Sequence, residues 1–200
     1  MKKLVILSMV ILLLLSPVAT AVGCQQQPAP TTPTPTPTPT PIPPPTPETL
    51  TYTNSEYGFS MEYPEDWDIL EDYMGTVVFL GGPAVLEGTY MINISVAAQE
   101  LPTKMTLEDF VRGGELIDKE TIPNYNKEEE YNTTIGGLPT SVQTITGTVE
   151  LDGEDLLLRG KAARFVKDKF GYIITYDVPT EFHDQYLDYF ELVISSFKFE

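Results

Sequence analysis

A proline-rich segment, residues 28–47, divides this 200-residue chain into a short leader and a longer C-terminal part. The segment contains eleven prolines, most of them alternating with threonine. Such a composition cannot bury apolar surface and favours an extended polyproline II conformation, so it predicts a disordered tether over residues 24–47. We therefore expect folding to be confined to residues 48–200, which are enough for one domain with a single core.

Residues 1–23 have the charge and hydropathy order of a secretory signal peptide. Two lysines precede an apolar run over residues 4–15, and small residues follow. The run Ala21-Val22-Gly23-Cys24 resembles the lipobox of bacterial lipoprotein precursors, in which the cysteine sulfur is diacylated and the leader is removed. The resemblance implies an extracytoplasmic protein that is anchored to the lipid bilayer of the cell membrane through acylated Cys24. An uncleaved membrane helix and a cysteine placed there by chance are the alternatives.

The chain is strongly acidic, with a formal net charge of −17. Removal of the leader would leave 10 basic residues against 29 acidic ones, a charge of −19. Such a charge repels phosphate backbones, so we expect no nucleic-acid partner. Because Cys24 is the only cysteine, we expect no disulfide, no thiolate catalysis and no cysteine-based metal site.

Alternating apolar residues predict β-strands in the first half of the domain. Residues 59–63 alternate and end at Pro64, and residues 90–97 alternate over a longer stretch. Residues 76–80 form an apolar run that we expect Gly81-Gly82-Pro83 to close. These patterns indicate half-buried antiparallel strands.

A long hairpin is predicted in the second half. Residues 140–151 and 156–166 are β-rich runs on either side of Asp152-Gly153, a strong hairpin signal. Gly136-Gly137 predicts a turn before the hairpin, and residues 170–178 predict another strand after it.

Two helices are predicted. The first begins after Thr106, a good N-cap, although Gly113-Gly114 weakens its middle by about 1 kcal/mol per glycine. Packing must therefore hold this helix together, or it breaks there. Its expected apolar face carries Leu107, Phe110, Val111, Leu116 and Ile117. The second begins at Thr180 and must bury a broad apolar stripe against the sheet. This stripe carries Phe182, Tyr186, Tyr189, Phe190, Val193, Ile194 and Phe197.

Three stretches of the domain resemble the PsbP-like and DcrB-like proteins: residues 57–67 (YGFSMEYPEDW), 172–176 (YIITY) and 193–199 (VISSFKF). The glycine turn at residues 136–139 fits the same pattern. The resemblance spans most of residues 50–200. It implies an α+β fold with a central antiparallel β-sheet flanked by helices, a PsbP-like α/β/α sandwich. Relatives serve as non-enzymatic accessory or binding modules, so the resemblance implies such a role here.

No catalytic constellation is recognisable, and we expect no catalytic residue, cofactor or metal. The single histidine, His183, is predicted to face solvent in the first turn of the last helix. Arg159 and Lys161 share one face of a predicted strand and form a candidate interaction patch for an anionic ligand or partner. Pairing of these two residues with acidic side chains on neighbouring strands is the alternative.

Together these features predict a non-enzymatic binding or accessory module of the cell envelope. Its ligand is not identified, and an envelope protein is a candidate partner. A carboxylate-based glycan hydrolase is one alternative and needs two acids about 5–9.5 Å apart in a cleft. A Ca²⁺-dependent envelope protein is the other, although the acidic clusters at residues 65–68, 128–130 and 152–155 lack the spacing of a known calcium loop.

Overall fold

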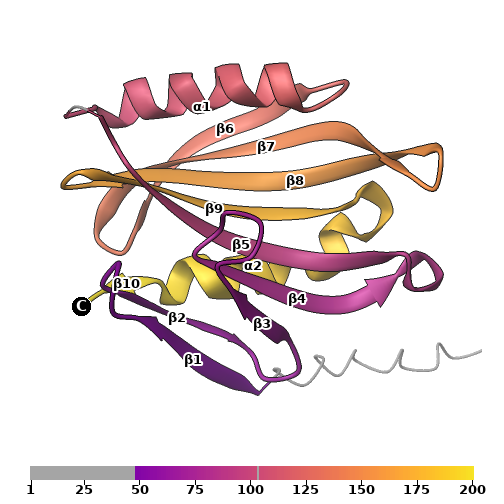
Figure 1. Ribbon diagram of the computed structural model, residues 1–200, viewed down its shortest axis with the longest axis horizontal. Helices are drawn as coiled ribbons and strands as arrows, with labels where there is room; N and C mark the ends of the chain where they lie inside the picture. The colour runs from indigo at the N-terminus through magenta and orange to yellow at the C-terminus, as the bar shows by residue number, and fades with distance from the viewer. Residues whose placement is uncertain (1–47, 103) are drawn as a thin grey trace, which may run out of the picture. The chain divides into compact units, whose positions relative to one another are not determined.

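The computed structural model describes residues 48–102 and 104–200, which form two antiparallel sheets and two α-helices (Figure 1). The predicted signal peptide, Cys24 and the proline-rich tether lie outside these residues. In the part of the chain that is described, neither helix is long and apolar enough to cross a membrane.

The large sheet has seven strands in the order β3-β4-β5-β9-β8-β7-β6, and every neighbouring pair is antiparallel. Its β7–β8 hairpin turns at Asp152 and Gly153, whose φ angles of 52° and 85° suit the tight turn that an Asp-Gly pair favours. The strand bounds are β3 Asp68–Glu71, β4 Val78–Val85, β5 Tyr90–Glu100, β6 Asn126–Ile135, β7 Leu138–Leu151, β8 Glu154–Lys167 and β9 Phe170–Pro179.

The main core lies between the large sheet and a small sheet of β1 (Thr49–Asn54), β2 (Phe59–Pro64) and β10 (Lys198–Phe199). Helix α2 (His183–Ser196) follows a 3-10 turn, Thr180–Phe182, and contacts both β2 and β9. Its predicted apolar stripe is buried there, with Phe190 and Val193 fully inaccessible to solvent. Burial of these side chains is the main stabilising term of this layer.

Helix α1 (Leu107–Thr121) packs on β7 and β8, on the opposite face of the large sheet from the main core. The Thr106 side chain accepts a hydrogen bond from the Asp109 N–H, which confirms the predicted N-cap. The helix runs unbroken through Gly113 and Gly114. A Cβ atom at Gly114 would lie 2.6 Å from Arg164 Nε, so glycine is what allows the helix to approach the sheet here.

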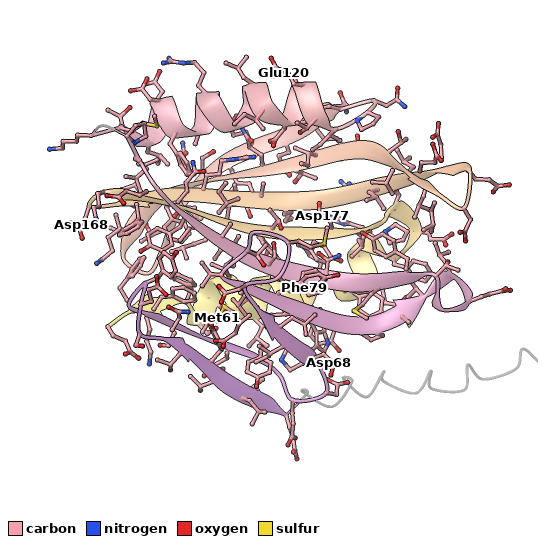
Figure 2. All side chains as sticks on the ribbon, viewed as in Figure 1. Met61, Asp68, Phe79, Glu120, Asp168 and Asp177 are labelled. Atoms are coloured by element: carbon pink, nitrogen blue, oxygen red, sulfur yellow. The ribbon has the colours of Figure 1, made fainter. Side chains whose placement is uncertain are left out.

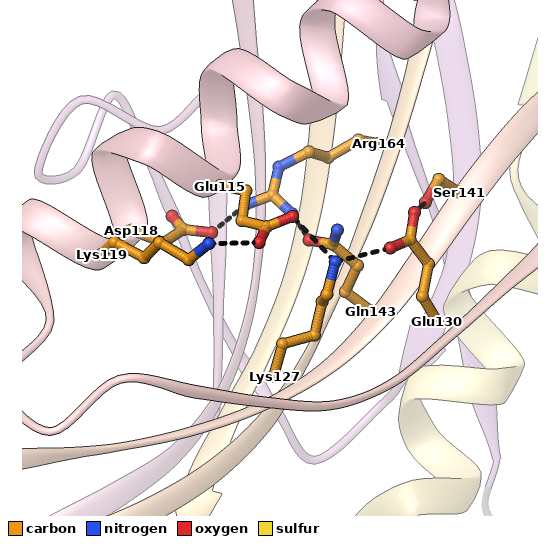
Figure 3. A network of polar contacts seen from close by, with 8 residues as sticks. All are labelled: Glu115, Asp118, Lys119, Lys127, Glu130, Ser141, Gln143 and Arg164. Atoms are coloured by element: carbon orange, nitrogen blue, oxygen red, sulfur yellow. Dashed lines mark hydrogen bonds and ion pairs between the residues drawn. The ribbon is translucent and has the colours of Figure 1, made fainter.

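A network of polar contacts holds α1 against the sheet (Figure 3). The Arg164 side chain is only 4% exposed, pairs with Asp118 of α1 and donates to Gln143 Oε1 at 2.7 Å. Lys127 Nζ donates to Glu115 of α1 and to Glu130 of β6, each at 2.8 Å. These contacts link the helix to three strands of the sheet.

The pKa values of the two glutamates respond to this network. Hydrogen bonds from Lys119 and then Lys127 lower the pKa of Glu115 to about 2. The Lys127 hydrogen bond also lowers the pKa of Glu130. Both carboxylates are therefore ionised at neutral pH and serve as ion-pair partners.

The predicted α+β class, with a central antiparallel sheet flanked by helices, is confirmed. One strand boundary was wrong, because β4 continues through Gly81-Gly82-Pro83 with a register shift between Gly81 and Ala84. The apolar face predicted for α1 was wrong in part. Leu116 and Ile117 are 58% and 59% exposed, because the polar network occupies that part of the face turned to the sheet.

Candidate ligand-binding groove

A groove of about 540 Å³ opens on the face of the large sheet that carries α1, next to the residues that follow the helix. The strand register places Asn93, Asp177, Gly160 and Ile145 side by side across it, on β5, β9, β8 and β7. Side chains alternate along a strand, so these positions share a face with Arg164 beneath α1. Figure 2 labels Asp177 and Phe79. Asp177 lies on β9, in the middle of this surface, and Phe79 lies on β4, at one side of it.

One wall of the groove is apolar and partly open to water. Tyr73 and Met74 come from the connection between β3 and β4, and the Tyr73 ring packs edge-on against Phe79 with centroids 5.1 Å apart. The Thr76 hydroxyl donates to Tyr73 O at 2.6 Å and so holds the connection in shape. Met74 is 84% exposed and Met91 is 44% exposed. Apolar side chains are thus presented at the rim.

The opposite wall depends on the residue after α1. Ile122 donates its N–H to Asp118 O at 2.8 Å, which ends the helix, and its side chain lies against Gly147 of β7. A Cβ atom at position 147 would clash with the Ile122 side chain. Thr148 N–H donates to Pro123 O at 2.8 Å and fixes the segment to the sheet. The position of α1 therefore determines the shape of the groove.

Asp177 supplies the one carboxylate among the residues that line the groove. A Cβ atom at Gly160 would lie 2.5 Å from Asp177 Oδ1, so glycine leaves room for the carboxylate. The Tyr90 hydroxyl and the Asn93 amide donate to the backbone oxygen of Asp177, at 3.2 and 3.4 Å. Neither of these contacts neutralises the carboxylate.

No lysine, arginine or histidine among residues 48–102 and 104–200 forms an ion pair with Asp177. The pKa of Asp177 is raised to about 6, chiefly by burial and also by the negative charge of Asp118, while a hydrogen bond with Thr175 opposes both. At neutral pH the groove therefore holds an anionic group with apolar walls and no counterion from the described chain.

A second hollow, of about 530 Å³, lies between α1 and β6 and is lined by Glu108, Glu115 and Glu130. Lys127 bridges Glu115 and Glu130. Lys119 and then Lys127 lower the pKa of Glu115, and Lys127 lowers the pKa of Glu130. A glycosidase requires a carboxylic acid that is protonated near neutral pH. The lowered pKa values make Glu115 and Glu130 unsuited to that role.

Arg159 and Lys161 of the candidate interaction patch lie on the other face of the sheet. Arg159 Nε pairs with Glu128 at 2.9 Å, and its Nη1 lies 3.8 Å from Asp184. Lys161 is only 8% exposed, with Nζ 3.4 Å from Thr144 Oγ1 and 5.2 Å from the Tyr131 ring centroid. The two residues thus share a face as predicted, and both are engaged by neighbouring side chains. Their role as an interaction patch stays a prediction, as does lipidation of Cys24.

The prediction that His183 faces solvent was wrong. Its side chain is 4% exposed, and its ring lies 5.6 Å from the ring of Tyr176. His183 Nδ1 lies 2.9 Å from Asp184 Oδ1 and 3.4 Å from Arg159 Nη1. His183 is the first residue of α2 and lies three residues before Tyr186 and seven before Phe190, so the helical spacing places it on the stripe that faces the sheet.

The acidic clusters of the sequence do not converge on a metal site in the described ranges, where no group of three or more histidine, cysteine or acidic side chains could hold an ion. Glu128, Glu129 and Glu130 lie within β6, and two of them pair with basic residues.

Sequence reasoning did not identify Asp177 as a site residue. The only signal in the sequence was an acid between the two buried residues Tyr176 and Val178 of a predicted strand.

No protein-family model matches the chain, and no curated protein matches its sequence. Solved structures share its fold. Cyanobacterial PsbP (CyanoP) from Synechocystis sp. PCC 6803 is 16% identical, with a TM-score of 0.56 over 76% of this chain and 92% of CyanoP. LpqN, described as involved in cell envelope biogenesis of Mycobacterium tuberculosis, is 15% identical, with a TM-score of 0.54 over 76% of this chain and 90% of LpqN.

A third structure with the same fold is the Ran-binding protein Mog1p of Saccharomyces cerevisiae. It is 10% identical, with a TM-score of 0.52 over 77% of this chain and 96% of Mog1p. At these identities the similarity concerns the fold alone. The described domain therefore has the PsbP-like fold that the sequence resemblance implied.

Proposed function

We propose that this protein is an extracytoplasmic lipoprotein whose PsbP-like domain acts as a non-enzymatic binding module of the cell envelope. Its site is the groove beside α1. The leader, the lipobox-like run before Cys24 and the proline-rich tether support the anchored location. The similarity of fold to LpqN, which is described as involved in cell envelope biogenesis, agrees with this role.

The single observation that supports binding most strongly is the groove with its exposed apolar rim. Exposed apolar side chains that gather around one hollow mark a binding site, and Tyr73, Met74 and Met91 are 42%, 84% and 44% exposed around this one. Its volume of about 540 Å³ lies within the range typical of small-molecule sites, roughly 300–1,000 Å³. We therefore assign the groove to a small ligand with an apolar body.

The chemistry of the groove favours binding over hydrolysis. Acid–base catalysis on a glycan needs two carboxylates that face each other. Asp177 is the only acid among the groove residues, so the groove lacks the pair that a hydrolase requires. In the second hollow, the pKa values of Glu115 and Glu130 are lowered, which does not suit a general acid.

The anchor is tested by mass spectrometry of the protein purified from its membrane. The expected product begins at an acylated Cys24, and Cys24→Ser should leave the protein unacylated and release it from the membrane fraction. A chain that starts at Met1 with a free Cys24 thiol would contradict the proposed anchor.

Binding is tested with 2-(1-naphthyl)ethanol, a neutral apolar probe, by calorimetry on the full chain in nanodiscs against empty nanodiscs. Saturable binding is expected. Met91→Glu, which puts a charge on the apolar wall, should weaken it by about tenfold or more. Leu116→Glu is the matched control, an exposed apolar-to-acid change on α1 outside the groove. Equal loss in both variants, or no saturable binding, would contradict the assignment of the groove.

A further inference from the structure

We infer that the groove selects a small amphipathic amine, an apolar ring or chain with one ammonium group, which pairs with the carboxylate of Asp177. This inference rests on the proposed binding function and names the chemical class of the ligand. It follows from the combination of apolar walls with a carboxylate that has no basic partner among the described residues.

The charges around Asp177 favour a cation. Other partly buried carboxylates of the domain have a basic partner, as Asp118 has in Arg164 and Glu115 has in Lys127. Asp177 instead has Asp118 as the charged group that acts on it, and that charge is also negative. A ligand ammonium would supply the missing counterion in a place where apolar walls reduce screening by water.

The space around Asp177 also fits such a ligand. Gly160 has no side chain to cover the carboxylate, and a Cβ atom there would overlap with Asp177 Oδ1 and Tyr176 O. Tyr90 and Asn93 hold the backbone oxygen of Asp177, so the strand cannot easily turn the residue away. An ammonium at the carboxylate would place an attached apolar body among the side chains of Phe79, Met91 and Ile145.

An anionic ligand is disfavoured by the same features. It would lie next to an unpaired carboxylate in a groove whose lining includes no lysine, arginine or histidine. A neutral ligand would gain the apolar contacts and leave the carboxylate partly desolvated without compensation. The amine is the class that satisfies both parts of the groove.

Three probes share one naphthyl ring and differ in charge: the cation of 2-(1-naphthyl)ethylamine, the neutral 2-(1-naphthyl)ethanol and the anion of 1-naphthaleneacetic acid. Their affinities are measured at pH 7.5 by calorimetry on the full chain in nanodiscs of zwitterionic lipid, with empty nanodiscs subtracted. The amine should bind about tenfold or more tightly than the alcohol, as expected for a hydrogen bond to a charged group. The acetate should bind most weakly.

Asp177→Asn keeps the shape of the side chain and removes its charge, so it should reduce amine affinity to that of the alcohol. Asp168→Asn is the matched control. It lies in the β8–β9 turn at a positive φ that asparagine tolerates, far from Asp177 in Figure 2. Emission of the buried Trp67 shows whether each variant is folded.

The outcomes distinguish this inference from the proposed function. Equal affinity for amine and alcohol, or an amine preference that survives Asp177→Asn, overturns the amine assignment and leaves the apolar groove as a binding site. Failure of all three probes to bind overturns both the amine assignment and the groove. An amine preference that is lost in Asp177→Asn and retained in Asp168→Asn supports the inference.

Discussion

Gly114 and Arg164 meet where α1 crosses β8, and a Cβ atom at position 114 would lie 2.6 Å from Arg164 Nε. The buried guanidinium uses this space to reach Asp118 on the next turn of the same helix. Because Ile122, which forms a wall of the groove, directly follows α1, this contact also determines the shape of the candidate site.

The two helix glycines should therefore respond in opposite ways to alanine. A Cβ atom at Gly113 would have no neighbour within 4 Å, so Gly113→Ala should raise the free energy of unfolding by about 0.5–1 kcal/mol through helix propensity. Gly114→Ala must displace Arg164 and should lower it by about 1–2 kcal/mol. Urea denaturation followed by Trp67 emission measures both. Stabilisation by Gly114→Ala equal to that by Gly113→Ala would contradict the packing of α1.

The buried ion pair should matter far more than an exposed one. Asp118→Ala leaves the Arg164 guanidinium, 4% exposed, without its anion and should cost about 3 kcal/mol of unfolding free energy. Glu100→Ala removes the partner of Lys169 in a pair whose two side chains are each 63% exposed, and should change stability by no more than about 0.5 kcal/mol. Similar small effects of both changes, measured by the same urea titration, would show that Arg164 is not buried as described.

Asp177 should make stability depend on pH in a direction opposite to most carboxylates. Its folded pKa of about 6 lies above the ordinary value of 3.8, so the folded state binds the proton more tightly than the unfolded state. The stabilising contribution of the protonated group is fully present below about pH 4 and is lost as the pH rises to about 6 and beyond.

Asp177→Asn cannot ionise, so it should not lose stability as the pH rises. At pH 7.5 we expect this variant to have a free energy of unfolding about 1–2 kcal/mol above that of the natural chain. The gain is smaller than for a fully buried carboxylate, because the groove is open to water. The difference should shrink toward zero at pH 4. Asp168→Asn, at an exposed turn, controls for the other titrating groups. A difference that does not change between pH 4 and pH 7.5 would rule out a raised pKa at Asp177.

Local signals explain what the sequence predicted well. Asp152-Gly153 determined the long hairpin, and Thr106 determined the start of α1, because both act through the backbone of their own neighbours. Strand β6 was missed, since it is a sheet edge whose residues are mostly exposed and polar and carry no apolar alternation. In the sequence its acids at 128–130 form only a cluster without the spacing of a calcium loop, whereas in the folded sheet two of them pair with Arg159 and Lys127.

The groove could not be predicted, because its residues come from five strands and two connections that meet only in the folded sheet. Such a tertiary relationship has no signature in local periodicity. The burial of His183 does have one. His183 lies three residues before Tyr186 and seven before Phe190, positions that share one face of an α-helix, and Tyr176 on β9 completes its surroundings.

The methionine methyl groups provide the most direct test of the groove as the binding site. Met74 and Met91 line it, whereas Met61 lies in the main core and is 1% exposed. The measurement is a titration of the full chain, labelled with ¹³C at the methionine methyls, with 2-(1-naphthyl)ethanol followed by NMR. We predict saturable shifts of the Met74 and Met91 signals with Met61 unchanged. Unchanged Met74 and Met91 signals at saturating probe would contradict the account.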